Sequence, residues 1–409
     1  MALTVINSLL DTDLYKLTMQ KAILGYKQGV PVRYVFNNRR PEGKFNDKFM
    51  TALREELEHM EALYLKPAEA DFLRVACPFL GEDYISYLYN YSFNPSEVKA
   101  ELVGGDLSLS IEGPWERTIL WEVPLMALIS ELYFLLCDTG WTFDRDLQTE
   151  RVTDKARLLA NAVGEGMGGP TGGVHPANFA DFGTRRRRDF RTQDLVVETL
   201  KGWANFVGTS NVHLAKIHGV KPLGTMAHEW IMGISALEGL KHANRYAMKV
   251  WADVYKGSLG TALPDTFGTA AFWEDFDGFY ARLFDGVRHD SGDPVRFGYA
   301  TIAHYKKLGI NPMSRTIIYS DGLDAEGAAS LRKEFHNKIN VSFGIGTNLT
   351  NDYTDSKPLN MVIKLSECNG VPVVKLSDVP TKAIGDKDAL RVAKWTFFGT
   401  PLDEGARLS

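Results

Sequence analysis

The sequence lacks the features that mark an extracellular, membrane or nucleic-acid-binding protein. Its 409 residues contain three cysteines, Cys77, Cys137 and Cys368, and their odd number and wide spacing exclude a disulfide framework and a four-cysteine zinc site. The net charge of −5 disfavours a general attraction to nucleic acid or anionic lipid. The start of the chain has no signal-peptide pattern, and the longest apolar run, about residues 125–137, is too short to span a bilayer. We therefore expect a cytoplasmic protein with free thiols and neither nucleic-acid nor membrane partners.

The length and composition favour two structural regions. Apolar residues make up 44% of the chain, which is enough for a large core. Residues 1–140 combine helical spacing with a predicted hairpin around Gly104-Gly105, and a second hairpin is predicted around Asn369-Gly370. We expect a mixed α+β domain built from residues 1–140 and 355–409, and a second domain of residues 141–354.

Residues 177–350 repeat a short apolar run, a polar cluster and a helical segment. This alternation indicates parallel strands joined by crossover helices. Because the units are short, we expect an irregular α/β barrel of about seven parallel strands rather than an open doubly wound sheet. The carboxyl ends of such strands share one edge, so the polar clusters should line one mouth. The clusters lie at 180–185, 207–211, 222–225, 263–269, 287–293, 318–322 and 343–348.

The last cluster has the chemistry of an anion site. Gly346 lets backbone N–H groups approach an anion, and Thr347 adds a hydroxyl donor. The pattern is neither a Walker motif nor Gly-x-Gly-x-x-Gly, and such a turn alone is more often a tight corner. Six companion clusters at the same rim favour the phosphate interpretation. The glycine-rich stretch 164–173, just before the barrel, is predicted as either a mobile cover or a plain surface linker.

The fifth cluster holds two side chains that a helix start does not explain. Residues 291–294 have the turn, cap and proline of a helix N-terminus. Arg288 and Asp290 remain, and both should point into the mouth. Arginine can hold a carboxylate or phosphate through two bonds, and aspartate can bind ribose hydroxyls or a Mg²⁺ shell. Asp321 offers the same two options, and Asp265 is a third acidic candidate.

His228 follows the third cluster and begins a predicted helix. Most histidines are surface or hydrogen-bonded core groups, but an imidazole held by a carboxylate at one nitrogen can use the other as a nucleophile or base. In the first cluster, Phe182 can stack on a flat ring and Arg185 lies at the mouth. Arg186 is a secondary candidate, and the last two members of the 185–188 arginine run are expected to face solvent or a partner.

Taken together, these segments resemble the nicotinate phosphoribosyltransferase family. The resemblance runs in order from residue 10 to about 350, and this order is more specific than any single motif. The motifs are Thr12-Asp13-Leu14-Tyr15-Lys16, Phe182-Gly183-Thr184-Arg185-Arg186, Gly208-Thr209-Ser210-Asn211, Gly224-Thr225-Met226-Ala227-His228-Glu229, Asp290-Ser291-Gly292-Asp293 and Ser320-Asp321-Gly322.

The resemblance implies an ATP-dependent ligase of NAD biosynthesis. It would form nicotinate mononucleotide and pyrophosphate from nicotinate and phosphoribosyl pyrophosphate, with ATP hydrolysed through a phosphorylated His228 and Mg²⁺ entering with substrate phosphates or at Asp290 or Asp321. The implied contacts are Tyr15 and Phe182 for the pyridine ring, Arg288 and Asp290 for the base and ribose, Gly346 and Thr347 for the phosphate, and Arg39 for the diphosphate. The family homodimer would place Asp13 and Tyr15 in the other subunit's site.

Ser210 favours an acid substrate over an amide. The related enzyme acting on nicotinamide has an aspartate there, which would repel a carboxylate. Nicotinamide and quinolinate phosphoribosyltransferases are the nearest alternatives. A barrel aldolase or isomerase would usually need a lysine at a strand end, and none of the seven clusters shows one. A non-catalytic sensor of pyridine nucleotides would bind without turnover.

Overall fold

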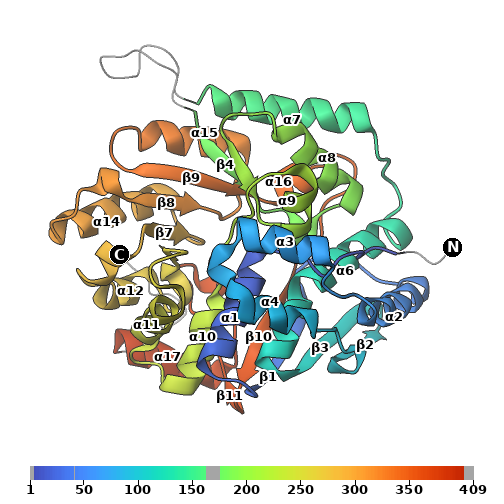
Figure 1. Cartoon of the computed structure of the whole chain (residues 1–409), viewed down its shortest axis with the longest axis horizontal. Helices are drawn as coiled ribbons and strands as arrows, with labels where there is room; N and C mark the ends of the chain where they lie inside the picture. The colour runs from blue at the N-terminus through green and yellow to red at the C-terminus, as the bar shows by residue number, and fades with distance from the viewer. Residues whose placement is uncertain (1–3, 41, 163–175, 400–409) are drawn as a thin grey trace.

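The computed structural model describes residues 4–40, 42–162 and 176–399 as two sheets with helices around them (Figure 1). One sheet is antiparallel and the other is parallel, so the predicted α/β fold with a second, mixed region is confirmed. The three cysteines are free, also as predicted. The glycine-rich stretch 164–173, for which a cover was one interpretation, lies outside the described residues.

The antiparallel sheet joins the two ends of the chain. Its strands lie in the order β11-β10-β1-β3-β2, with bounds β1 (Pro31–Asn38), β2 (Val98–Val103), β3 (Asp106–Pro114), β10 (Met361–Cys368) and β11 (Val371–Pro372). Both predicted hairpins are confirmed. Each turns through two residues with positive φ, Gly104-Gly105 and Asn369-Gly370, which matches the twist of the flanking strands. Because β10 pairs with β1, the C-terminal hairpin extends the N-terminal sheet.

Helix α6 (Glu122–Leu136) is buried on nearly every side. With α5 (Trp115–Thr118) and a short 3₁₀ turn it forms one helical stretch, Trp115–Leu136, longer than the apolar run that the sequence predicted. By length and composition this stretch is able to cross a membrane, but 83% of its apolar window is buried inside the protein. It therefore serves as a core helix. The other N-terminal helices are α1 (Leu14–Tyr26), α2 (Asp47–Glu61), α3 (Pro67–Ala76) and α4 (Gly81–Tyr89).

The parallel sheet has six strands among the described residues, not the seven predicted. Their order is β5-β4-β9-β8-β7-β6, with bounds β4 (Asn178–Asp181), β5 (Phe206–Thr209), β6 (Thr261–Ala262), β7 (Gly286–His289), β8 (Thr316–Tyr319) and β9 (Asn340–Ile345). The expected seventh strand makes only an isolated parallel bridge, Thr209 to Pro222. A hydrogen bond from the Thr225 hydroxyl to the Thr261 carbonyl oxygen, 3.2 Å, links the same segment to β6. The segment thus lies between β5 and β6 without forming a ladder.

The helix predicted to begin at His228 is confirmed. It ends at Glu238, before Gly239, whose φ of 90° a side chain rarely adopts. The predicted cap at Asp293 is confirmed, since its side chain accepts a hydrogen bond from the Arg296 N–H at 2.8 Å. The helices are α7 (Arg145–Ala160), α8 (Phe190–Leu200), α9 (Val212–His218), α10 (His228–Glu238), α11 (Ala243–Tyr255), α12 (Thr269–Asp275), α13 (Tyr280–Leu283), α14 (Pro294–Lys307), α15 (Ala325–Glu334) and α16 (Thr347–Thr350).

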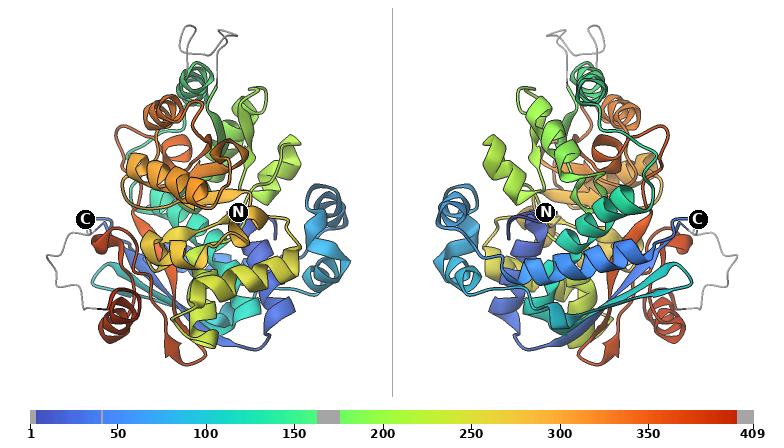
Figure 2. Two further views of the ribbon diagram at one scale, coloured as in Figure 1. Left: turned by 90° about the vertical axis from the view of Figure 1, so that its left-hand side faces the viewer. Right: turned by 90° about the vertical axis from the view of Figure 1, so that its right-hand side faces the viewer.

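The two sheets occupy different parts of one molecule. Both views in Figure 2 show helices α7, α14 and α15 above, and the antiparallel sheet with α17 (Lys387–Phe398) below. One continuous cluster of buried apolar side chains extends through both parts. The division of the chain at residue 141 stays a prediction.

Candidate active site

Polar side chains gather where the parallel strands end. Phe182 and Arg185 follow β4, Ser210 follows β5, Asp290 follows β7, Asp321 follows β8, and Gly346 and Thr347 follow β9. Because parallel strands end at one edge, these loops meet there. Asp290 contributes to the pKa shifts of His228 and Arg185, and the charge of Arg288 helps to lower the pKa of Asp290. The structure therefore brings residues far apart in the sequence into one mouth.

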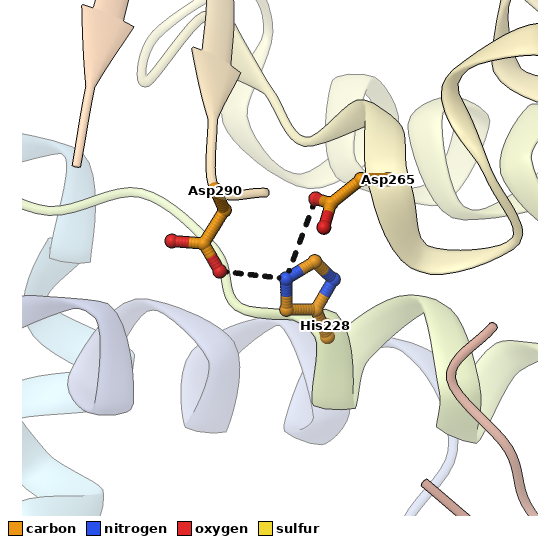
Figure 3. Close-up of side chains that lie close together, drawn as sticks. All are labelled: His228, Asp265 and Asp290. Atoms are coloured by element: carbon orange, nitrogen blue, oxygen red, sulfur yellow. Dashed lines mark hydrogen bonds and ion pairs between the residues drawn. The ribbon is translucent and has the colours of Figure 1, made fainter. Parts of the chain in front are cut away.

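His228 is the first residue of α10 and its side chain is buried. Its Nδ1 lies 2.9 Å from the Thr266 hydroxyl oxygen, and its Nε2 lies 2.9 Å from Asp290 Oδ2 and 3.5 Å from Asp265 Oδ1 (Figure 3). Both ring nitrogens thus have polar partners. An imidazole held in this way is oriented for use as a nucleophile.

Lys375 completes the surroundings of this imidazole, and the sequence analysis missed it. Its Nζ lies 2.8 Å from His228 Nε2 and 3.0 Å from Asp265 Oδ2. The lysine comes from the segment after the C-terminal hairpin, where the Leu376 N–H donates to the Thr266 carbonyl at 2.8 Å. Nε2 therefore faces a donor and an acceptor, so either ring tautomer finds a partner.

The charges of this cluster favour a neutral imidazole between ionised carboxylates. Burial and the ammonium of Lys375 lower the pKa of His228, against the opposing charges of Asp265 and Asp290. Burial raises the pKa of Asp290, but the hydrogen bond from His228 and the charge of Arg288 outweigh it and hold that pKa well below its usual value. The pKa of Asp265 is lowered by His228 and Lys375, again against burial.

The carboxylates of this mouth do not fit a metal ion held by the protein alone. His228, Asp265 and Asp290 have ligand atoms within 4.8 Å of one another, the spacing of a metal site. The ammonium of Lys375 already lies against these groups, and both oxygens of Asp321 lie 2.6 Å from Lys382 Nζ. Mg²⁺ needs several free oxygen ligands around it, which these paired carboxylates do not offer.

Phe182 packs its ring against β9. A side chain at Gly344 would come within 2.2 Å of this ring, so glycine is required for the close approach. The Phe182 N–H donates to the Ile345 carbonyl at 2.9 Å, which fixes the turn after β4. Gly346 is less tightly confined, since a Cβ there would lie 3.0 Å from the Phe182 carbonyl oxygen. The predicted phosphate loop therefore supports the aromatic residue as well.

Asp13 and Ser210 lie in contact. The Ser210 hydroxyl donates to Asp13 Oδ1 at 2.7 Å, and an antiparallel bridge joins Asp13 to Asn211. Burial raises the pKa of Asp13. Tyr15 and Asp13 also help to raise the pKa of Arg185, which places all three together. In the structure this segment lies at the mouth of its own chain. The role of Asp13 and Tyr15 in the site of a second subunit stays a prediction.

The four consecutive arginines, residues 185–188, differ in how deeply their side chains are buried. Arg185 is partly exposed, with 40% of its side chain accessible, and its Nη1 lies 3.6 Å from Glu122 Oε1. Arg187 and Arg188 are fully buried, so the prediction that they face solvent or a partner is wrong. Two guanidinium nitrogens of Arg187 bind Asp11 at 2.8 Å each, and Arg188 stacks 3.6 Å above the ring of Phe134. The paired charge and the aromatic ring supply what burial requires.

The remaining predicted residues lie around the rim. Arg288 is half-buried, and its Nε has no hydrogen-bond partner among the described residues. Arg39 is exposed at the end of β1, and its charge contributes to the lowered pKa of Arg186. Thr347 begins α16. Contact of Arg39, Arg288 and Thr347 with a substrate stays a prediction, as does the pyridine sandwich between Tyr15 and Phe182.

Two family models match this chain. The nicotinate phosphoribosyltransferase (NAPRTase) N-terminal domain matches residues 10–130, and the NAPRTase family model matches residues 177–400, more than half of the chain. This chain belongs to the nicotinate phosphoribosyltransferase family.

Individual members of the family resemble the chain over almost its whole length. The nicotinate phosphoribosyltransferase of Methanosarcina mazei is 47% identical over 98% of this chain and 100% of its own, and that of Chromohalobacter salexigens is 45% identical over 95% and 98%. The crystal structure of the Porphyromonas gingivalis enzyme is 37% identical and has a TM-score of 0.89 over 96% of this chain and 100% of that one. The Vibrio cholerae structure is 36% identical with a TM-score of 0.90 over 98% and 95%. The family is one of enzymes, and so is this chain.

The sequence analysis of this family member missed the lysines of the mouth. Lys364 in β10 lies close to the charged groups of Glu122, Arg185, Lys375 and Asp290. Burial, together with the positive charges of Arg185 and Lys375, lowers the pKa of Lys364 to about 8. The seven predicted clusters at the strand ends hold no lysine, but Lys364 and Lys375 reach the mouth from the C-terminal part of the chain. The signal was present, because Lys364 and Lys375 each interrupt a run of apolar residues.

Proposed function

We propose that this enzyme transfers the phosphoribosyl group of phosphoribosyl pyrophosphate to nicotinate, giving nicotinate mononucleotide and pyrophosphate in NAD biosynthesis. The observation that carries the proposal is the near full-length similarity to relatives named nicotinate phosphoribosyltransferase. The mouth supports it with a flat aromatic ring at Phe182 and with two arginines, Arg185 and Arg288, suited to carboxylate and phosphate groups.

The transfer requires charge stabilisation rather than an acid–base pair. The bond from ribose C1 to the pyrophosphate oxygen breaks, its electron pair leaves with pyrophosphate, and the pyridine nitrogen forms the new bond to C1. Positive charge builds on the sugar and negative charge on the leaving group, which cationic side chains stabilise. Arg288, with a buried nitrogen free of protein partners among the described residues, and Lys364 supply that charge. Asp290 faces the developing positive charge of the ribose.

Nicotinate is the proposed base because the pocket offers donors and positive charge. The Ser210 hydroxyl, now bound to Asp13, can turn to a substrate carboxylate, and Arg185 lies beside both. Nicotinamide is the alternative substrate, since Asp13 could accept hydrogen bonds from its amide. Turnover of nicotinate, nicotinamide and quinolinate, measured side by side, separates the candidates.

ATP is the proposed co-substrate. His228 would attack the γ-phosphorus of ATP, so that the bond to the β–γ bridging oxygen breaks, ADP leaves and a phosphohistidine forms. Water would later take the phosphoryl group as inorganic phosphate. The lowered pKa of His228 supports this role, because a neutral imidazole keeps the lone pair that the attack requires. Mg²⁺ would arrive with the substrate phosphates. We further propose a homodimer and a cytoplasmic location.

Replacement of His228 tests the proposal. With His228→Asn, we expect no phosphoryl transfer from ATP to the protein and no stimulation of nicotinate turnover by ATP, while slow ATP-independent transfer remains. His242→Asn, at an exposed histidine, is the matched control and should behave as the unsubstituted enzyme. Intact-protein mass spectrometry after incubation with ATP reports the phosphoryl group, and product assays with and without ATP report the coupling. Phosphoryl transfer that persists in His228→Asn would refute the role of His228.

A further inference from the structure

A buried chain of charges connects the helix of His228 with Arg185. Lys16 is fully buried, and its Nζ lies 2.5 Å from Glu122 Oε2 and 2.5 Å from Glu229 Oε2. Glu229 directly follows His228 at the start of α10. The other oxygen of Glu122 lies 3.6 Å from Arg185 Nη1. The ammonium of Lys16 therefore bridges two carboxylates. Glu229 is adjacent to His228 in the sequence, and Glu122 lies beside Arg185.

The helix that carries Lys16 also packs along the loop that leads to His228. The Thr18 hydroxyl donates to the Thr225 carbonyl at 2.6 Å, and the Ala227 N–H lies 3.3 Å from the sulfur of Met19. A side chain at Gly224 would come within 2.8 Å of the Tyr15 nitrogen. Residues 15–19 of α1 are thus packed against residues 224–229, so a shift of one segment affects the other.

Glu229 is held from three sides. Besides Lys16, its Oε1 accepts hydrogen bonds from the Tyr34 hydroxyl at 2.5 Å and from Trp115 Nε1 at 2.9 Å. The Trp115 ring leaves no room for a side chain at Gly233, one turn further along α10, where a Cβ would lie 2.1 Å from it. The N-terminal turn of α10 is therefore fixed to the N-terminal region through Glu229.

We propose that Lys16 is the positioning residue that couples the phosphorylation state of His228 to the placement of Arg185 and Tyr15 at the base. A phosphoryl group on His228 brings roughly two negative charges to the first turn of α10. These charges shift the first turn of α10, and Glu229 moves with that turn. Lys16, which is paired with Glu229, passes the displacement to Glu122 and, through α1, to Tyr15. Arg185 is the partly exposed end of this chain and is free to respond. The inference rests on the ATP coupling proposed above.

The experiment compares the effect of ATP on nicotinate binding in matched variants. In the unsubstituted enzyme, ATP should lower the KM for nicotinate by a factor within the roughly 5–150-fold range usual for coupled sites. In the double variant Lys16→Met with Glu229→Gln, which removes the ammonium without leaving two facing carboxylates, the factor should fall below about two-fold. Lys16→Met alone is the second variant. His228 must still take up a phosphoryl group in both, as seen by mass spectrometry.

Two controls distinguish coupling from stability. Tyr34→Phe removes the buried hydrogen bond that the Tyr34 hydroxyl donates to Glu229 but leaves the ion pairs of Lys16 intact, so it should lower the melting temperature and keep the ATP effect. Lys27→Met, at an exposed lysine just after α1, should change neither the melting temperature nor the ATP effect. An ATP effect retained in the phosphorylated double variant overturns the role of Lys16. Absence of any ATP effect in the unsubstituted enzyme instead overturns the proposed ATP coupling.

Discussion

The two sides of the mouth are built from different chemistry. The side formed after β4 and β5 presents an aromatic ring, a hydroxyl and one partly exposed guanidinium, at Phe182, Ser210 and Arg185. The side formed at α10 and β7 is a cluster of charges in which His228 contacts Asp290 and a lysine. A flat organic base is suited to the first side and phosphoryl groups to the second, so one rim can serve two kinds of chemistry.

Both sides are completed by parts of the chain outside the parallel sheet. The N-terminal segment brings Asp13 to Ser210, and the segment after the C-terminal hairpin brings Lys375 to His228. These two segments belong to opposite ends of the chain, and the antiparallel sheet holds them in place because β10 pairs with β1. The parallel sheet therefore supplies the rim, and segments outside it supply the residues that distinguish the two sides.

The largest expected effect is a difference in stability between variants of Arg187 and Arg185, which both follow β4. Arg187→Met leaves Asp11 as an uncompensated buried charge, and we expect a loss of about 3–5 kcal/mol in the free energy of unfolding. Arg185→Met removes a partly exposed side chain, so stability should change by less than roughly 0.5 kcal/mol while the KM for nicotinate rises. Denaturant unfolding measures the free energy of unfolding of both variants, and steady-state kinetics measures their KM for nicotinate. Equal stability of both variants would contradict the distinction.

On the histidine side, Asp290→Asn should impair catalysis more than stability. It removes the charge that faces His228 and Arg288 but keeps the size of the side chain. We expect kcat/KM to fall by roughly 100-fold, which corresponds to about 2.7 kcal/mol, and phosphoryl uptake by His228 to slow as well. Asp293→Asn, at the cap of α14, is the control, because asparagine caps a helix as well as aspartate. A drop confined to stability would show that Asp290 is only structural.

A smaller change should move substrate choice on the base side alone. Ser210→Asp places a second carboxylate against Asp13 and should weaken nicotinate binding by about 10-fold, or roughly 1.4 kcal/mol, relative to nicotinamide. Ser210→Ala, which only removes the hydroxyl, should reduce nicotinate binding without favouring the amide. Competition between the two bases under one set of conditions measures the ratio. An unchanged ratio would remove Ser210 from the specificity argument.

The smallest effect concerns Lys364, which lies between the two sides. Its pKa of about 8 means that the ammonium is present below this pH and is lost above it. The KM for phosphoribosyl pyrophosphate should therefore rise a few-fold between pH 7.5 and 9, by roughly the fraction of charge lost. Lys364→Met should show the high-pH KM throughout, and Lys364→Arg should remove the pH dependence by keeping the charge. A rise that persists in Lys364→Arg assigns the titration to another group.

Local patterns predicted much of the fold. Two-residue turns at Gly104-Gly105 and Asn369-Gly370 identified the hairpins, because positive φ at both positions restricts the residues that fit. Apolar runs followed by polar clusters located the parallel strands. The same pattern overestimated the strand count, since the segment near Pro222 satisfies the apolar pattern but pairs only through one bridge. Whether a short run forms a ladder depends on its neighbours, which periodicity does not report.

The sequence by itself determined the strand–loop–helix order, the rim residues that follow each strand and the family motifs around His228. Tertiary structure alone decided which charges are buried together. Arg187 and Arg188 are buried although charge runs are usually solvated, and Lys375 reaches His228 from the segment after the C-terminal hairpin. The physical reason is that a buried charge is stable only when an opposite charge or polar partner meets it in space. Such partners lie far apart in the sequence, so only the folded chain shows them.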